Sequence, residues 1–307
     1  MLILVTGGAG YVGSVLVPAL LSQGHRVRVL DRLRGSGQGL LLCCNHPGFA
    51  FVHGDVCDEP TVASALDGVE VVVHLAAIVG YPACQLDPDL AKTTNVAGTK
   101  LLLGLRGPDQ KVVLASTGSV YGAVSDAVCS EESAPSPVSL YASTKAEAEE
   151  LVLHAGNAVV YRYATAFGVS PCMRFDLLPN DFVHQAVHQG SLTIYQSGFR
   201  RTFIHVHDMA RSVIFAVNEW DSLADGLYNV GDESMNLTKV ELAERIGRHV
   251  DCRLRFDEFA ADADQRDYEV SYRKIRAKGF RPSVDLDQGI AQVVTAARLM
   301  WDRGGMT

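Results

Sequence analysis

The sequence contains no apolar run that approaches the roughly 20 residues needed to span a membrane as a helix. It also has no excess of basic residues, since 27 lysines and arginines stand against 35 aspartates and glutamates, for a formal net charge of -8. No broad basic surface is therefore expected, which argues against nucleic acid as a partner. We expect a protein that binds neither membranes nor nucleic acid.

CxxC pairs, internal repeats and low-complexity tracts are absent as well. The seven cysteines are scattered, so we expect free thiols and no metal site. The first apolar run breaks after four residues at a glycine-rich segment, unlike a secretion signal, and we expect a cytoplasmic protein. With 307 residues, 48% hydrophobic and 20% charged, the composition is that of a globular enzyme with one substantial core or two linked ones.

The N-terminal sequence is the most informative segment that is present. A short apolar strand at 2–5 leads into TGGAGYVG at 6–13 and then into an apolar stretch of helical spacing. Glycines in such a turn permit a tight bend, close approach of a pyrophosphate and close packing of helix on strand, and the start of the helix offers N–H groups to the anion. The turn therefore predicts a dinucleotide site. Its expected cofactor contacts are Gly7, Gly10, Tyr11 and Val12.

The acidic residue after the next apolar run indicates which dinucleotide binds. Asp31 stands eighteen residues after Gly13, where a carboxylate meets the adenosine ribose. It accepts hydrogen bonds from a free 2′-hydroxyl and repels a 2′-phosphate, which favours NAD over NADP. The neighbouring Arg32, which we count among the cofactor contacts, and Arg34 leave NADP open, because each is either a phosphate ligand or a solvated loop charge.

Six short β-branched runs alternate with helical stretches in the first half of the chain. They lie at 2–5, 27–30, 50–52, 69–73, 112–114 and 159–161. This alternation predicts an α/β fold with a Rossmann-like, doubly wound parallel sheet. The ligand crevice is then expected at the carboxyl ends of the strands.

The alternation breaks down beyond about residue 165, where glycine, proline and asparagine become frequent. We expect 1–165 to form the NAD-binding domain, with 202–230 returning to it, and 166–307 to form mainly a smaller, interleaved substrate-binding portion. The helical patterns at 183–188, 208–218, 238–250 and 286–301 are too short and interleaved to predict a second independent core.

A tyrosine and a lysine are placed for acid–base chemistry. The sequence YASTK at 141–145 opens a helix, and the spacing of four puts Tyr141 and Lys145 on one face. Tyrosine ionises at about pH 10 in water, so it acts as a base near neutrality only with a cation such as Lys145 beside it. Upstream, strand 111–115 ends in a hydroxyl cluster that includes Thr117 and Ser119, and one hydroxyl there is placed to bind the reacting oxygen.

Together these motifs resemble the extended short-chain dehydrogenase/reductase family, most closely its nucleotide-sugar epimerases and dehydratases. Further matching segments span nearly the whole chain: DVCD at 55–58, HLAA at 74–77, NVAGT at 95–99 and RTFIHVHD at 201–208. The resemblance implies an enzyme in which Tyr141 is the catalytic base or acid, Lys145 is its partner and a ribose ligand, and Thr117 is the hydroxyl donor.

The resemblance also implies binding roles. Cofactor contacts are expected from Asp55, Val56, Leu75, Ala76, Ala77 and Asn95, in addition to Tyr141 and Lys145. Contacts to a nucleotide-diphosphate sugar are expected from Thr117, Ser119, Asn180, Arg201 and Arg266, the arginines as phosphate ligands. For each of these arginines, a charge with no ligand is the alternative. His74, His205 and His207 are expected to be structural.

Two departures from the family pattern bear on the reaction. The sugar 4,6-dehydratases carry an Asp-Glu pair directly after the hydroxyl residue, where this chain has Gly118 and Ser119. Neither is a useful acid or base, so ordinary dehydration is disfavoured unless Cys84 or Glu131 supplies the missing group. The other departure is MRFDLL at 173–178, which replaces a proline-rich turn and in which Arg174 either contacts substrate or is a loop charge.

We therefore expect an NAD-dependent nucleotide-sugar epimerase that acts through a transient keto sugar by reversible hydride transfer. An NAD(P)-dependent ketoreductase, an unusual dehydratase and a non-catalytic NAD-binding sensor are the alternatives. In this family helices such as those expected at about 90–105 and 140–154 often pair across a dimer axis, so a homodimer is predicted. The leucines that would supply its apolar surface, or face their own sheet instead, are Leu101, Leu102, Leu103, Leu151 and Leu153.

Overall fold

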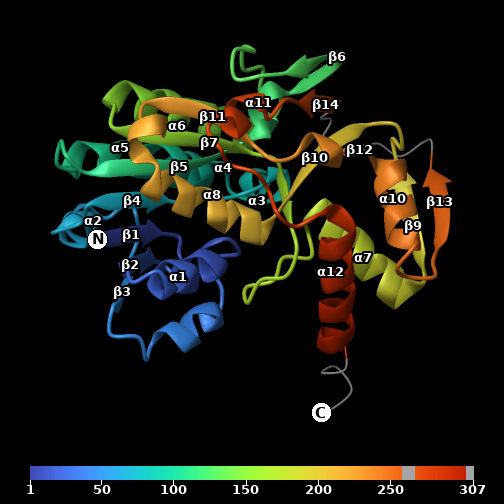
Figure 1. Ribbon diagram of the computed structural model, residues 1–307, viewed down its shortest axis with the longest axis horizontal. Coiled ribbons are helices and arrows are strands. Elements are labelled where there is room, and N and C mark those ends of the chain that lie inside the picture. Colours follow the sequence, from blue (N-terminus) through green and yellow to red (C-terminus); the bar gives the residue numbers. More distant parts are fainter. Residues whose placement is uncertain (258–266, 302–307) are drawn as a thin grey trace.

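Seven parallel strands form the main sheet, in the order β11-β7-β5-β4-β1-β2-β3 (Figure 1). The structure is a computed structural model that describes residues 1–257 and 267–301. The strands are β1 (Leu2–Thr6), β2 (Arg26–Asp31), β3 (Phe49–His53), β4 (Val71–His74), β5 (Lys111–Thr117), β7 (Ala158–Tyr163) and β11 (Gly226–Val230). All six predicted strands are present and the doubly wound α/β fold is confirmed, with β11 as a seventh strand.

Helices cover both faces of this sheet. On one face α1 (Gly13–Ser22) packs beside α8 (Val206–Asn218). On the other lie α2 (Glu59–Leu66), α5 (Gly98–Leu105) and α6 (Leu140–Ala155). Side chains alternate along each strand, so the adjacent Val72 and Val73 of β4 enter different hydrophobic clusters, one on each face. This is why the central strands read as continuous apolar runs.

A second group of elements lies to the right in Figure 1. It contains α7 (Leu178–Gln189), α10 (Lys239–Gly247), α12 (Leu286–Trp301) and the parallel pair β9 (Ser191–Tyr195) and β13 (Arg253–Asp257). Phe182, Leu242 and Ile290, one from each helix, belong to a separate cluster of buried hydrophobic side chains. Three stretches distant in the sequence thus combine into one hydrophobic cluster, which their separate local patterns did not indicate.

Shorter elements connect these two parts. β10 (Arg200–His205) pairs with β8 (Thr165–Phe167) and β12 (Asn236–Thr238), and β6 (Ala123–Cys129) pairs with β14 (Asp267–Val270). The remaining helices are α3 (Tyr81–Leu86), α4 (Pro88–Lys92), α9 (Trp220–Leu223) and α11 (Arg273–Ala277), with a π-helical turn at Thr93–Ala97 and 3₁₀ turns at Gln38–Cys43, Gly118–Tyr121 and Glu233–Met235.

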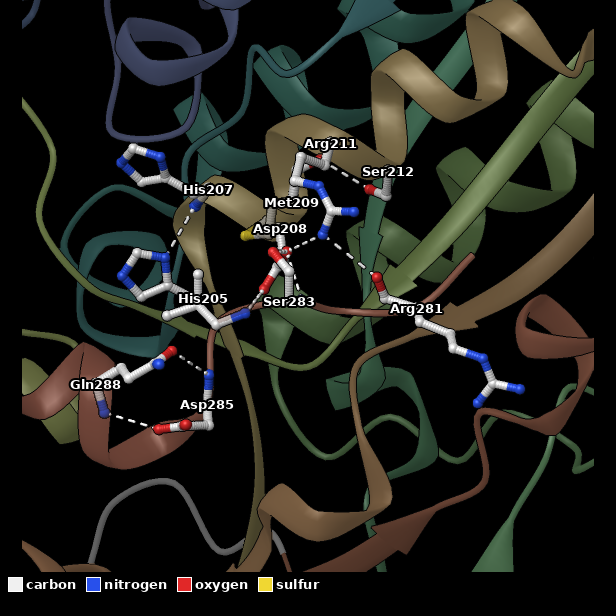
Figure 2. A network of polar contacts seen from close by, with 11 residues as sticks. His205, His207, Asp208, Met209, Arg211, Ser212, Arg281, Ser283, Asp285 and Gln288 are labelled. Atoms are coloured by element: carbon white, nitrogen blue, oxygen red, sulfur yellow. Dashed lines mark hydrogen bonds and ion pairs between the residues drawn. The ribbon is translucent and has the colours of Figure 1, made fainter. Parts of the chain in front are cut away.

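Asp208, fully buried in the first turn of α8, joins the two parts (Figure 2). Its carboxylate accepts hydrogen bonds from the Ser283 N–H and hydroxyl, both at 3.0 Å, and from the Val284 N–H at 2.9 Å. Arg211 donates a fourth bond at 2.6 Å. These bonds hold the segment that leads into α12 against the helix that covers the main sheet.

The structure also bears on the cysteines and on membrane-spanning helices. All seven cysteines are free thiols, as expected. None of the helices within 1–257 and 267–301 combines the length and apolar character that crossing a membrane requires.

Candidate active site

The carboxyl ends of the sheet strands border a cavity of about 500 Å³. Asp31, Thr117 and Tyr163 are the last residues of β2, β5 and β7, and all three line it. Parallel strands present such residues at one edge of the sheet. The predicted cofactor-binding, catalytic and substrate-binding residues that line the cavity are Gly7, Gly10, Tyr11, Val12, Asp31, Arg32, Asp55, Val56, Leu75, Ala76, Ala77, Thr117, Ser119, Tyr141 and Lys145.

The glycine-rich turn has the shape of an anion cradle. Gly7 has φ +69°, and a Cβ atom there would lie 2.7 Å from the Ala76 nitrogen, so only glycine fits. A Cβ atom on Gly13 would lie 2.5 Å from the Gly8 Cα atom, which keeps the start of α1 close to the turn. The first N–H groups of a helix have no acceptor within it, so they and the helix dipole favour an anion at this point.

Asp31 is held against the same turn. Its carboxylate accepts hydrogen bonds from the Ala9 N–H at 2.9 Å and the Leu33 N–H at 2.8 Å. The next residue, Arg32, pairs with Asp55 at 2.8 Å. Arg32 is therefore engaged by a carboxylate of the cavity wall, whereas Asp31 is fixed at the end of β2, where a ribose is expected.

Tyr141 and Lys145 lie on the first two turns of α6, which begins after the Ser139 cap. Both line the cavity. Lys145 is only 4% exposed, and this burial lowers the pKa of its ammonium to about 8, an effect that Glu149 opposes. The Lys145 ammonium therefore loses its proton at only slightly alkaline pH. Its positive charge is what would favour a Tyr141 phenolate.

The hydroxyls at the end of β5 are linked to one another. The Thr117 hydroxyl donates to the Ser119 hydroxyl at 2.9 Å and accepts from the Ser119 N–H at 3.1 Å. On β4, His74 bonds the Thr6 hydroxyl at 2.7 Å and the Thr99 hydroxyl at 3.0 Å. Burial, together with the Lys145 charge, lowers the His74 pKa to about 3, so this histidine is neutral and structural, as expected.

Asn95, a predicted cofactor ligand, lies outside the cavity lining. It is buried in the π-helical turn, where its side chain accepts from the Ile78 N–H at 2.7 Å and donates to the Ile78 carbonyl and the Thr144 hydroxyl, both at 3.0 Å. It therefore joins the loop after β4 to the helix that carries Tyr141 and Lys145.

Two predicted substrate ligands also lie outside the cavity lining. Asn180 is fully buried, and its side chain binds the Gly168 N–H at 3.0 Å, the Tyr11 hydroxyl at 3.2 Å and the Arg174 carbonyl at 2.9 Å. Arg201 is buried in β10 and donates to the Arg200 carbonyl at 3.1 Å. A third predicted ligand, Arg266, lies outside the described residues.

The cavity has further lining residues that the motifs did not indicate. They include Ile78, Val79, Gly80, Tyr81, Tyr163, Ala164, Thr165, Ala166, Leu177 and Met209. Those at 163–166 follow the strand predicted at 159–161, so the strand-end rule would have found them. Arg174, for which two readings were open, lines the cavity, and its guanidinium binds both oxygens of Asp176, at 3.0 and 2.5 Å.

Residues 3–231 match the profile of the NAD dependent epimerase/dehydratase family. The chain belongs to this family. It is 31% identical to a dTDP-glucose 4,6-dehydratase of Streptomyces niveus, over 96% of this chain and 92% of that protein. It is similar in structure to UDP-glucose 4-epimerase of Thermus thermophilus in complex with NAD (TM-score 0.84, 28% identity, 97% and 99% of the two chains). It is also similar to a dTDP-glucose 4,6-dehydratase of Streptomyces venezuelae with NAD bound (TM-score 0.86, 28% identity, 99% and 98%).

The chain is accordingly an NAD-dependent enzyme of the extended short-chain dehydrogenase/reductase group. Its own geometry fits the cofactor. Apart from its neighbours in the chain, a Cβ atom on Gly10 would have only the Gly7 carbonyl oxygen within 4 Å among the residues that the structure describes, so the turn leaves space for a pyrophosphate. Asp31 brings a carboxylate to the cavity wall at the neighbouring strand end.

Proposed function

We propose that this enzyme is a nucleotide-sugar epimerase that acts through a transient keto sugar. The observation that carries the proposal is the position of the carboxylates that line the cavity. Among the described residues, only Asp31 and Asp55 bring carboxylates to its wall, and both lie near the glycine-rich turn. Asp31 accepts a hydrogen bond from the Ala9 N–H, and Asp55 pairs with Arg32. Thr117, Tyr141 and Lys145 thus have no neighbouring acid in the described cavity wall with which to remove water from a sugar.

The groups considered as substitutes for that acid have other roles. Cys84 is buried and donates to the Ile78 carbonyl, and Glu131 accepts from the Asn229 N–H at 2.7 Å. Neither lines the cavity. At Gly118 a Cβ atom would lie 3.3 Å from the Tyr268 hydroxyl, so a longer side chain there would compete with a buried tyrosine. These contacts support a reaction that needs only oxidation and reduction of a sugar carbon.

The three proposed catalytic residues then have separate tasks. When bound, NAD supplies the group that takes a hydride from the sugar and returns it. The Tyr141 oxygen accepts the proton of the sugar hydroxyl and later gives it back, while the Lys145 ammonium stabilises the phenolate. The Thr117 hydroxyl donates a hydrogen bond to the same sugar oxygen. Epimerisation follows if the keto sugar turns before it is reduced on its other face.

The proposed function implies roles for the two parts of the chain. We propose that 1–165 with 202–230 hold NAD and that 166–307 form mainly the part that binds the nucleotide-diphosphate sugar.

We also propose that two chains associate through α5 and α6. Leu102 is buried within its own chain, and the partly buried Leu101, Leu103 and Leu153 pack against the same cluster, so only their exposed parts are open to a partner. Light scattering tests the homodimer, and a monomer at micromolar concentration would exclude it.

The test of the reaction is product analysis with UDP, dTDP, GDP and CDP sugars. The expected result is an epimer of one substrate without accumulation of reduced cofactor. Tyr141→Phe should lower the rate by about 10²–10⁴-fold, while native mass spectrometry still detects bound NAD. A product lighter by one water would establish a dehydratase instead.

A ketoreductase is the second candidate, because Arg34 also lines the cavity and could meet a 2′-phosphate. It would consume NADPH or NADH in proportion to a keto sugar. Bound NAD without turnover of any substrate would identify a sensor.

A further inference from the structure

A buried ion pair lies next to the proposed catalytic lysine. Glu149 follows Lys145 by one helical turn on α6 and is 3% exposed. Arg162, 4% exposed on β7, donates to it from Nε at 3.1 and 3.0 Å and from Nη2 at 2.7 Å. Two parallel N–H···O contacts of this kind fix the carboxylate in position as well as in charge.

The same carboxylate is tied to the strand that carries the reacting hydroxyl. The Ser116 hydroxyl donates to Glu149, and Ser116 directly precedes Thr117 on β5 and lines the cavity. The Arg162 guanidinium lies 4.9 Å from the ring centre of Tyr121. Glu149 therefore joins α6, β5 and β7, the elements that carry Lys145, Thr117 and the cavity wall at Tyr163.

The charges around Lys145 show what Glu149 does for it. On its own helix Lys145 has Tyr141 one turn before and Glu149 one turn after it. From β4 it is faced by His74, whose pKa of about 3 leaves it neutral. Arg162, on β7, is directed at Glu149. Burial disfavours the ammonium form of Lys145, and Glu149 acts in the opposite direction.

We propose that Glu149 is a positioning residue of the site: its carboxylate, fixed by Ser116 and Arg162, keeps the buried Lys145 side chain as an ammonium beside Tyr141. The inference rests on the proposed roles of Tyr141 and Lys145. A carboxylate with a purely structural role would affect folding alone, whereas this one sets the pH at which the Tyr141 phenolate forms.

The experiment measures that ionisation directly and needs no substrate. The tyrosinate absorbance of each variant is compared, across pH, with that of the same variant carrying Tyr141→Phe. Glu149→Gln should move the ionisation of Tyr141 upward by about one pH unit, because less of the Lys145 ammonium then remains at each pH at which the phenol ionises. The matched control is Glu150→Gln, which makes the same change at an exposed position of the same helix and should leave the ionisation in place. Glu149→Asp should restore most of the wild-type behaviour.

The outcome that overturns the proposal is a folded Glu149→Gln protein whose Tyr141 ionises where it does in Glu150→Gln. If Glu149→Gln does not fold, the double variant Glu149→Gln with Arg162→Gln removes both charges of the buried ion pair, so that Arg162 is not left without its carboxylate, and Tyr141 should again ionise at higher pH. An unchanged ionisation in that variant would equally overturn the proposal.

Turnover is a separate readout. With an established substrate, the alkaline fall of kcat should begin at lower pH in Glu149→Gln, with KM little changed. A protein that turns over no sugar but shows the tyrosinate shift would refute the epimerase and retain the role of Glu149.

Discussion

The hydroxyl of Tyr268 lies 3.3 Å from the point that a Cβ atom on Gly118 would occupy. Tyr268 is 1% exposed and comes from β14, whereas Gly118 directly follows Thr117 at the end of β5. A Cβ atom next to the proposed hydroxyl donor would therefore be in tight contact with the phenol, which would have to move by a few tenths of an ångström to admit it. This contact gives a physical reason for the glycine at a position where the resembling dehydratases carry an acid.

The contact predicts that an acid cannot simply be inserted. Gly118→Asp should destabilise the protein by about 1–3 kcal/mol, because a carboxylate is forced against a buried ring. Urea unfolding measures the change. Combining it with Tyr268→Phe, which removes the hydroxyl, should recover part of the loss, with Tyr268→Phe alone as the control. Strictly additive effects of the two substitutions would show that the residues do not compete for this space.

The second prediction concerns the choice of cofactor. Asp31→Asn keeps the size of the side chain and removes the charge that opposes a 2′-phosphate. The preference for NAD over NADP should fall by about tenfold, or ~1.4 kcal/mol, as measured by Kd titrations of both cofactors. Asp67→Asn is the matched control, because it makes the same change at an exposed position outside the cavity lining. It should leave the preference as it is, and an equal loss of preference in the two variants would contradict the role of Asp31.

The third prediction follows from the buried histidine between Thr6 and Thr99. The pKa of His74 is lowered to about 3 in the folded protein, against about 6.5 in the unfolded chain. As the pH falls, His74 is therefore protonated first in the unfolded chain. Its contribution to the free energy of unfolding is fully present above about pH 6.5 and is lost as the pH falls toward 3. For this single group the slope is about 1.4 kcal/mol per pH unit.

Urea unfolding at several pH values between 7 and 4 measures this loss. His205, whose pKa burial lowers to about 4, adds to the slope in the same direction. The His74→Gln protein should be less stable at pH 7 and should lose stability less steeply on acidification. A slope identical to that of the wild type would show that His74 does not contribute.

Local patterns in the sequence determined the framework of this protein. Six strands, the glycine turn, the acid at the end of β2, and the tyrosine and lysine on one helix face were all predicted and lie as expected at one cavity. Each of these patterns depends on residues within a few positions of one another, and parallel strands then place their carboxyl ends at a common edge. Many of the polar side chains that line the cavity could be predicted from the sequence for the same reason.

Contacts between distant segments were decided only by the tertiary structure. Asn180 does not line the cavity but donates a hydrogen bond to the hydroxyl of Tyr11, 169 residues away. Ser116 and Arg162, on separate strands, both bind Glu149. The second hydrophobic core likewise combines helices from distant stretches. A buried polar group must find partners wherever packing brings them, and no local period in the sequence records which segment that will be.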